Sequence, residues 1–165
     1  MKKVDKSGQQ MMGMSFGMIF AVFMIVVFLV IAFIAVRGFL DIGDTAEVGL
    51  FWKSLQEEVD DAWRGQSSST KFKIKLPRGV EKICFGDLNG RITGLEEDYL
   101  AVRDFEVYDA NAFLIPRGAA EGLEFKLISH INLEKIIEDQ NPYCVDVTNG
   151  LVIEKDFYDK LVIIR

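Results

Sequence analysis

The sequence predicts an α+β fold with a long N-terminal transmembrane helix. This helix continues into an amphipathic helix packed on a small antiparallel β-sheet ectodomain. Three observations lead to this fold class: residues 7–36 contain no charged side chain, residues 48–63 carry apolar side chains at helical spacing, and later runs alternate apolar and polar residues between turn signals. We therefore divide the chain into a cytoplasmic basic leader (1–10), a transmembrane helix (11–36), an amphipathic helix with a polar loop (37–70) and a small, mostly-β extracytoplasmic domain (71–165).

The uncharged run is long enough to cross a bilayer. As a helix, residues 11–36 extend ~39 Å, and a hydrocarbon core is ~30 Å thick. The run is too long for the apolar region of a cleaved secretory signal, and no Ala-x-Ala site follows it. We therefore expect a permanent anchor in the cell membrane.

Charges on either side of the run predict its orientation. Basic residues favour the cytoplasmic side. The charges concerned are Lys2, Lys3 and Lys6 before the run, and Asp41, Asp44 and Glu47 beyond Arg37. The sequence thus predicts a single-pass protein with its N-terminus in the cytoplasm and its C-terminal domain outside.

The chain beyond the anchor is acidic. From Arg37 onward it carries 16 Lys/Arg and 24 Asp/Glu, a net charge of −8. Such a surface repels phosphate backbones, so we expect no nucleic-acid partner.

An amphipathic helix is expected after the anchor. Its apolar face consists of Val48, Phe51 (or Trp52), Leu55, Val59 and Trp63. Asp44 and Glu47 have the spacing of a capping box, so we expect the long helix to kink near Gly43, or to stop there and restart. Gly65 ends the helix.

The rest of the chain predicts short strands and turns. Strands are expected at 71–76, 80–85, 102–107, 112–115, 123–129 and 161–164. Asn132 caps a predicted short helix that reaches Asp139. Residues 143–147 and 151–154 are expected to form a hairpin around Asn149-Gly150, a turn sequence typical of tight hairpins.

Two cysteines, Cys84 and Cys144, lie in apolar surroundings sixty residues apart. Outside the cell, a disulfide between them would stabilise the domain by ~3–4 kcal/mol. Two buried free thiols are the alternative.

No catalytic constellation stands out. His130 is the only histidine, and its neighbour Ser129 would point to the opposite face of a strand. The cluster Glu96-Glu97-Asp98 lacks calcium-loop spacing, so we expect a solvated loop. The sequence therefore predicts no enzyme, no catalytic residue, no cofactor and no metal site.

Gly13, Gly17 and Ala21 recur every fourth residue in the apolar run. Such a ridge lets another membrane helix approach closely, so it predicts self-association through the N-terminal helix. The alternative is that glycine is simply common in membrane spans.

The first 65 residues or so resemble archaeal type IV pilins. A short basic segment, Lys2-Lys3-Val4-Asp5-Lys6, precedes Ser7-Gly8-Gln9 and the apolar run, and this order is similar to a class III, prepilin-type signal. The resemblance implies cleavage by a prepilin peptidase between Gly8 and Gln9, with the apolar helix retained. The chain departs from the pattern at Gly13, where many pilins carry Glu, and at Ser7, where a basic residue is common.

This resemblance implies a structural subunit of an extracellular filament or of a type IV pilus-like machine at the cell surface. In this reading, the subunit assembles through its N-terminal hydrophobic helix. The alternative is a single-pass, signal-anchored membrane protein whose ectodomain binds or scaffolds another envelope component.

Overall fold

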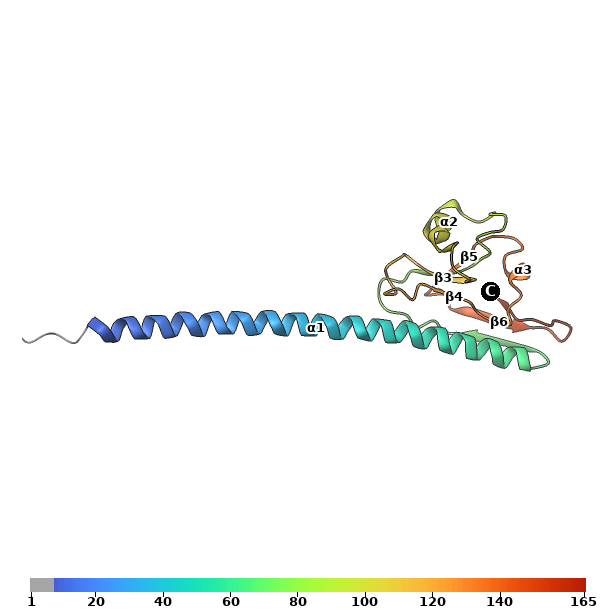
Figure 1. Cartoon of the computed structure of the whole chain (residues 1–165). Coiled ribbons are helices and arrows are strands. Elements are labelled where there is room, and N and C mark those ends of the chain that lie inside the picture. Colours follow the sequence, from blue (N-terminus) through green and yellow to red (C-terminus); the bar gives the residue numbers. More distant parts are fainter. Residues whose placement is uncertain (1–7) are drawn as a thin grey trace, which may run out of the picture. The chain divides into compact units, whose positions relative to one another are not determined.

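A computed structural model describes residues 8–165, except for the side chains of residues 8–16 and 39–42. The chain divides into two compact units, residues 1–41 and 42–165. Helix α1 (Gly8–Arg64) includes most of the first unit and the beginning of the second (Figure 1). Its helical assignment continues without a break, so of the two expectations for Gly43 the stop and restart is wrong, while the kink stays a prediction. A single glycine costs a helix only about 1 kcal/mol relative to alanine, which is too little to interrupt it.

In the first unit, α1 presents apolar side chains on every side. Residues 17–38 are all exposed, except Met24 and Val27, which are half-buried. By length and composition, α1 is the one helix in the described part of the chain that could cross a membrane. Near the end of the apolar run, the Arg37 guanidinium carbon lies 4.5 Å from the centre of the Phe33 ring.

In the second unit, α1 has one buried face. Val48, Leu55 and Val59 are fully buried, and Phe51 is nearly so. Trp63, the last member of the predicted face, is 39% exposed. The helix ends as predicted, with the Gly65 amide donating to the Asp61 carbonyl at 3.1 Å.

The β structure forms two antiparallel sheets where the sequence suggested one. The three-stranded sheet has the order β1 (Ser68–Phe72), β6 (Leu151–Lys155), β7 (Ile163–Ile164). The four-stranded sheet has the order β4 (Phe125–Lys126), β3 (Ala112–Ile115), β2 (Lys82–Phe85), β5 (Tyr143–Asp146). Strand β1 starts and ends earlier than predicted, and β4 and β7 cover only parts of their predicted ranges.

The predicted hairpin between residues 143–147 and 151–154 does not form. Strand β5 pairs with β2, and β6 pairs with β1 and β7, so the two segments belong to different sheets. Gly150, between them, has a φ of 72°. The turn sequence therefore carries the chain from one sheet to the other, and each strand pairs with a partner distant in sequence.

The strand predicted at 102–107 is also wrong. This region forms helix α2 (Glu96–Val102) and a 3-10 helix, η1 (Arg103–Phe105). Asp98 and Val102 are buried one helical turn apart, and Phe105 follows at a spacing of three. The buried residues of this segment therefore have helical spacing, which is consistent with a helix and not with a strand. Helix α3 (Leu133–Ile136) forms within the range predicted for it, and Asn132 caps it by accepting the Lys135 amide at 3.1 Å.

The four-stranded sheet is buried on both faces. Ile83, Phe85 and Leu114 point into a large core shared with α1 and the three-stranded sheet. Cys84 and Phe113 point the other way, into a smaller core beneath α2 and η1. In the second unit, α1 and α2 thus lie on opposite sides of the sheets (Figure 1).

Candidate functional site

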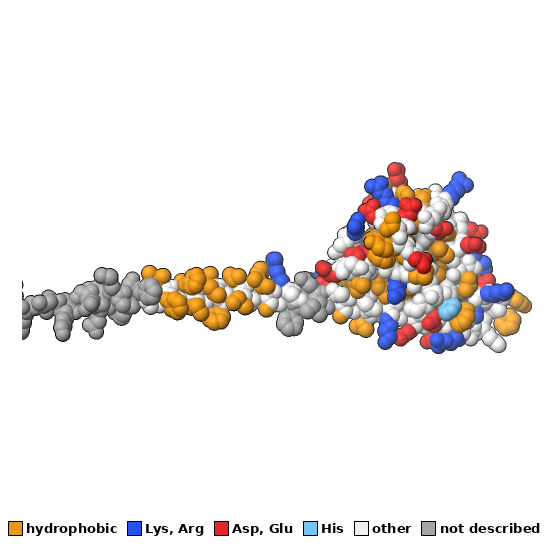
Figure 2. Space-filling view, in the orientation of Figure 1, with side chains coloured by type: hydrophobic (Ala, Val, Ile, Leu, Met, Phe, Trp, Pro, Cys, Tyr) orange, Lys and Arg blue, Asp and Glu red, His pale blue; other side chains and the backbone are white. Residues whose placement is uncertain are grey.

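The first candidate surface is the apolar run of α1. In Figure 2 apolar side chains cover the visible face of this run, while charges of both signs are spread over the second unit. Gly17 and Ala21 are exposed, and a Cβ at Gly17 would meet no atom within 4 Å. The side chain of Gln9 and the environments of Gly8 and Gly13 lie outside the described residues. A leader junction and the first member of the ridge therefore stay predictions.

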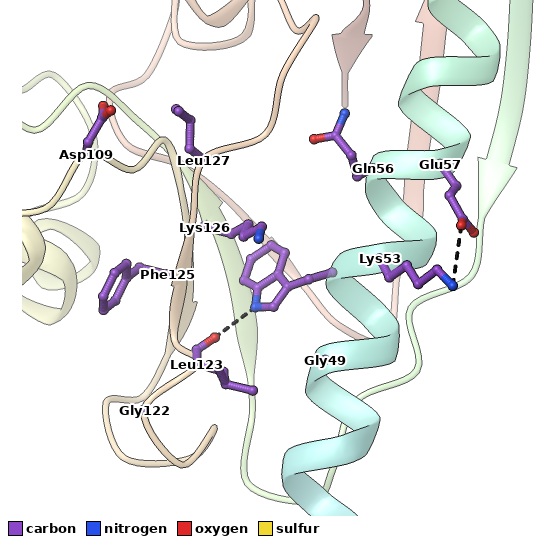
Figure 3. Close-up of a pocket in the computed structure, with 11 residues that line it drawn as sticks. Gly49, Lys53, Gln56, Glu57, Asp109, Gly122, Leu123, Phe125, Lys126 and Leu127 are labelled. Atoms are coloured by element: carbon purple, nitrogen blue, oxygen red, sulfur yellow. Dashed lines mark hydrogen bonds and ion pairs between the residues drawn. The ribbon is translucent and has the colours of Figure 1, made fainter.

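The second candidate is a groove of about 670 Å³ in the second unit. Its walls are α1 on one side and the chain around β4 on the other (Figure 3). Trp52 forms the apolar wall on the helix, and Phe125 lies opposite. Gly49 and Gly122 leave the groove open, because a Cβ at either position would meet no atom within 4 Å.

Trp52 ties the helix to the opposite wall. Trp52 is 4% exposed, and its Nε1 donates to the Leu123 carbonyl at 2.8 Å (Figure 3). The Phe125 ring stacks on Tyr108 with centroids 4.1 Å apart, so a ring contact also holds the opposite wall. Both walls are therefore fixed by contacts within the unit.

The rim of the groove carries charges of both signs. Lys53 and Glu57 approach to 3.8 Å on one helix face, and Asp109 and Lys126 lie on the other wall. Such a surface suits a partner with an apolar centre and a mixed polar edge. It has no nucleophile beside a base.

His130 belongs to a polar cluster that fastens a loop to α1. Its Nδ1 lies 3.0 Å from Asp60 Oδ1, and its ring stacks on Trp63. Because an ionised carboxylate only accepts hydrogen bonds, Nδ1 carries the proton. This hydrogen bond is the largest influence holding the pKa of Asp60 below its ordinary value; Gln56 adds a second. Gln56 also accepts the Ser129 amide at 2.9 Å.

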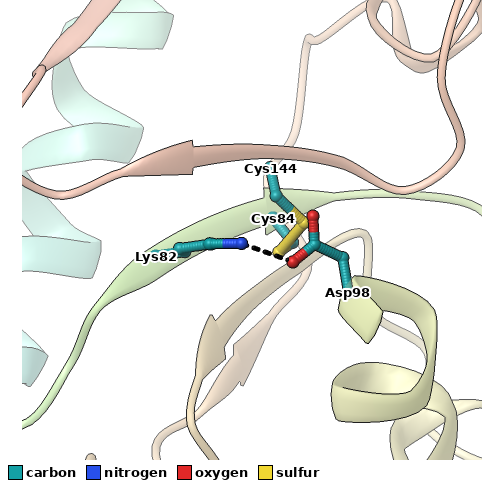
Figure 4. Close-up of a disulfide and its surroundings, with 4 residues drawn as sticks. All are labelled: Lys82, Cys84, Asp98 and Cys144. Atoms are coloured by element: carbon teal, nitrogen blue, oxygen red, sulfur yellow. Dashed lines mark hydrogen bonds and ion pairs between the residues drawn. A yellow bond between two sulfur atoms is a disulfide. The ribbon is translucent and has the colours of Figure 1, made fainter. Parts of the chain in front are cut away.

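Cys84 and Cys144 form a disulfide, as predicted. They are directly opposite each other on β2 and β5, with Cα atoms 4.0 Å apart. Beside them, Lys82 Nζ lies 2.7 Å from Asp98 Oδ1 (Figure 4). The expected solvated loop at Glu96-Glu97-Asp98 is wrong in two respects: these residues begin α2, and the Asp98 side chain is 4% exposed. Glu96 and Glu97 are exposed to solvent, as expected. The hydrogen bond to Asp98 is the main cause of a raised Lys82 pKa.

Among the described residues, no group of three or more His, Cys, Asp or Glu side chains could hold a metal ion. Comparisons with protein-family models, with curated proteins and with solved structures find no match to this chain. The function must therefore be argued from the chain's own surfaces.

Sequence reasoning singled out the buried face of α1 and the cysteine pair, but it missed three features. These are the groove beside Trp52, the Lys82–Asp98 ion pair, and the contact of His130 with Asp60. For Trp52 a signal existed, since it lies four residues after Val48 and three before Leu55. The other two join residues 16 and 70 positions apart, and no local pattern marks them.

Proposed function

We propose that this chain is a pilin-like structural subunit, which is anchored in a membrane and assembles through the N-terminal half of α1. The observation that carries the proposal is the exposure of the apolar run. Large side chains such as Phe20, Phe23 and Phe33 are more than half exposed, in a helix that has no charged residue before Arg37. Burying this surface requires lipid, other helices, or both.

The positions of the small residues support a helix contact. Gly17 and Ala21 lie about one turn apart, 40° around the helix at 100° per residue, and both are exposed. Two small residues on one side of this turn let a neighbouring helix approach closely there. Farther along the same face Met24 and Phe28 are larger, so the contact is placed at residues 17–21.

The decisive experiment changes this face while keeping its hydrophobicity. Gly17→Leu fills the face, whereas Val26→Phe adds bulk nine residues on, half a turn around the helix, and is the matched control. We expect both variants to insert into membranes. Gly17→Leu should lose cross-linked oligomers, or filaments seen by electron microscopy, and Val26→Phe should keep them. Equal assembly of both variants would remove the small-residue face from the proposal.

Processing is tested separately by the intact mass of the protein purified from its own membranes. Cleavage between Gly8 and Gln9 gives a chain that begins at Gln9. Recovery only of chain with the leader still attached would contradict the processed form.

A second function, favoured by the groove beside Trp52, is a membrane-anchored protein that binds another envelope component. Its test is pull-down from membranes with Gly49→Leu, which fills the groove from the exposed helix surface. Loss of one defined partner, with self-association intact, would favour this function over the pilin-like one.

A further inference from the structure

Three lysines form a row on the outer side of β1 and its continuation. From residue 71 to 76 the side chains alternate: Lys71, Lys73 and Lys75 are exposed, while those between them are buried or half-buried. Phe72 faces inward, with its ring centre 6.0 Å from that of Phe51 on α1. Burial of the alternate residues thus holds the three lysines on the outer side. We call Lys71, Lys73 and Lys75 the lysine track.

The three ammonium groups of the lysine track have no ion-pair partner within the described part of the chain. No ion pair or side-chain hydrogen bond engages Lys71, Lys73 or Lys75 there, although Lys82 and Lys135 each pair with an aspartate at 2.7 Å. An unpaired row of one sign is notable in a chain with a net charge of −6. It is a local exception to the acidic surface predicted from composition.

Two hollows adjoin the track and share Lys73. The first, of about 560 Å³, is lined by Lys71 and Lys73 together with Thr148 and Asn149, and it has no carboxylate in its lining. The second, of about 390 Å³, has Lys73 and Lys75 at its edge and Leu50, Phe51 and Phe72 in its lining, and Glu47 is its one acidic residue. Lysine ammonium groups, a hydroxyl and an amide together suit a ligand with both anionic and hydroxyl groups.

We propose that the lysine track binds an acidic polysaccharide, a sugar polymer with repeated carboxylate groups. Side chains two residues apart on an extended chain lie ~6.6 Å apart, so the track offers a repeating row of positive charge. The hydroxyls of such a polymer match Thr148 and Asn149. The site is independent of the pilin-like proposal, because it uses no residue of the apolar run.

Two observations favour a polysaccharide over other polyanions. The Cys84–Cys144 disulfide is typical of secreted and cell-surface proteins and rare in cytosolic and nuclear ones, which argues against a nucleic-acid ligand. The hollows are concave, whereas a bilayer offers a flat array of headgroups. A flexible anionic chain can follow both hollows.

The test measures binding of fluorescent polygalacturonate to the full chain in neutral detergent, at about 100 mM salt. Lys71→Gln/Lys73→Gln/Lys75→Gln is compared with Arg91→Gln/Lys160→Gln/Arg165→Gln, which removes the same charge from exposed basic residues elsewhere. We expect the first variant to bind about tenfold more weakly and the second nearly as the parent. Lys73→Gln alone should weaken binding about threefold, and neutral dextran should not bind.

Three results would overturn the proposal. One is no binding of polygalacturonate by the parent, or equal binding of neutral dextran. Another is an equal loss in both triple variants, which would show a response to net charge alone. The third is tighter, track-dependent binding of single-stranded DNA or of phosphatidylserine vesicles, which would assign the track to a nucleic acid or a membrane. Unchanged thermal unfolding of each variant confirms that the fold is intact.

Discussion

The rings of Trp63 and His130 lie face to face, with centroids 3.9 Å apart and planes 7° apart. Trp63 is in the last turn of α1, and His130 lies in the loop before α3. Since His130 also hydrogen-bonds Asp60 on the same helix, two contacts fasten this loop to α1. His130 has a φ of 65°, so the local backbone conformation is unfavourable and these contacts offset its cost.

We predict that His130→Asn destabilises the second unit by about 1–2 kcal/mol, because the ring stack is lost and the hydrogen bond to Asp60 is weakened. Asparagine is chosen because it tolerates a positive φ, so backbone strain does not add to the effect. Urea unfolding of the full chain in detergent, followed by tryptophan fluorescence, measures the change. Tyr158→Ala, at a side chain 93% exposed, is the control and should be neutral.

The lowered pKa of Asp60 predicts that the second unit loses stability in acid. The pKa of Asp60 in the folded protein is lowered, first by the hydrogen bond from His130. Ionised Asp60 therefore stabilises the fold fully above its unfolded-state pKa, near 3.9, and this stabilisation is lost as pH falls through the lower folded-state pKa. Asp60→Asn should show a shallower fall in unfolding free energy below about pH 4. A slope identical to that of the parent would contradict this role.

Removing the partner of Lys82 should destabilise the packing of α2. In Asp98→Ala, Lys82, whose side chain is 30% exposed, loses its carboxylate partner, and we expect a cost of about 2–3 kcal/mol. The parent should also lose stability in strong alkali. The folded-state pKa of Lys82 is raised, so its contribution is present below the unfolded-state pKa of about 10.4 and disappears as pH rises through the folded value.

The control for this pair is Lys82→Met/Asp98→Leu, which removes both charges and keeps similar volume. It should recover much of the stability lost in Asp98→Ala, and its unfolding should not respond to alkali through this pair. If the double variant is as unstable as Asp98→Ala, packing of the Asp98 side chain matters more than charge.

The disulfide is expected to contribute about 4 kcal/mol, since it closes a loop of sixty residues in the unfolded chain. Cys84→Ala/Cys144→Ala should lower the free energy of unfolding by that order. Reductant should lower the stability of the parent and leave that of the variant unchanged. Equal stability of parent and variant without reductant would contradict the prediction.

Gly150 and Gly122 form a matched pair for testing the crossing between the sheets. Both have a positive φ, 72° and 88°, but a Cβ at Gly150 would lie 3.0 Å from the Phe72 carbonyl oxygen, and one at Gly122 meets nothing within 4 Å. We expect Gly122→Ala to cost about 1 kcal/mol and Gly150→Ala about 2–3 kcal/mol, because only the second adds a clash with β1. Equal costs in urea unfolding would show that the contact with Phe72 is easily relieved.

Local patterns in the sequence determined several parts of this protein. The uncharged run predicts a helix with an apolar surface, and the three-to-four spacing of Val48, Phe51, Leu55 and Val59 predicts the face that is buried. The Asn132 cap is equally local, because it depends on an amide three residues away. In each case neighbours within about one helical turn carry the information.

The tertiary structure decided which distant segments pair. Alternation shows that residues 143–147 and 151–154 favour strands, but it cannot show that β5 belongs beside β2 and β6 beside β1. The same limit applies to Asp98. In the sequence it looks like a solvated acidic residue, but in the fold it is buried and paired with Lys82. The limit applies also to the lysine track, whose hollow is completed by residues 147–152, far along the chain. Burial and pairing are free energies of contact between segments brought together by the whole fold, so no local window of sequence contains them.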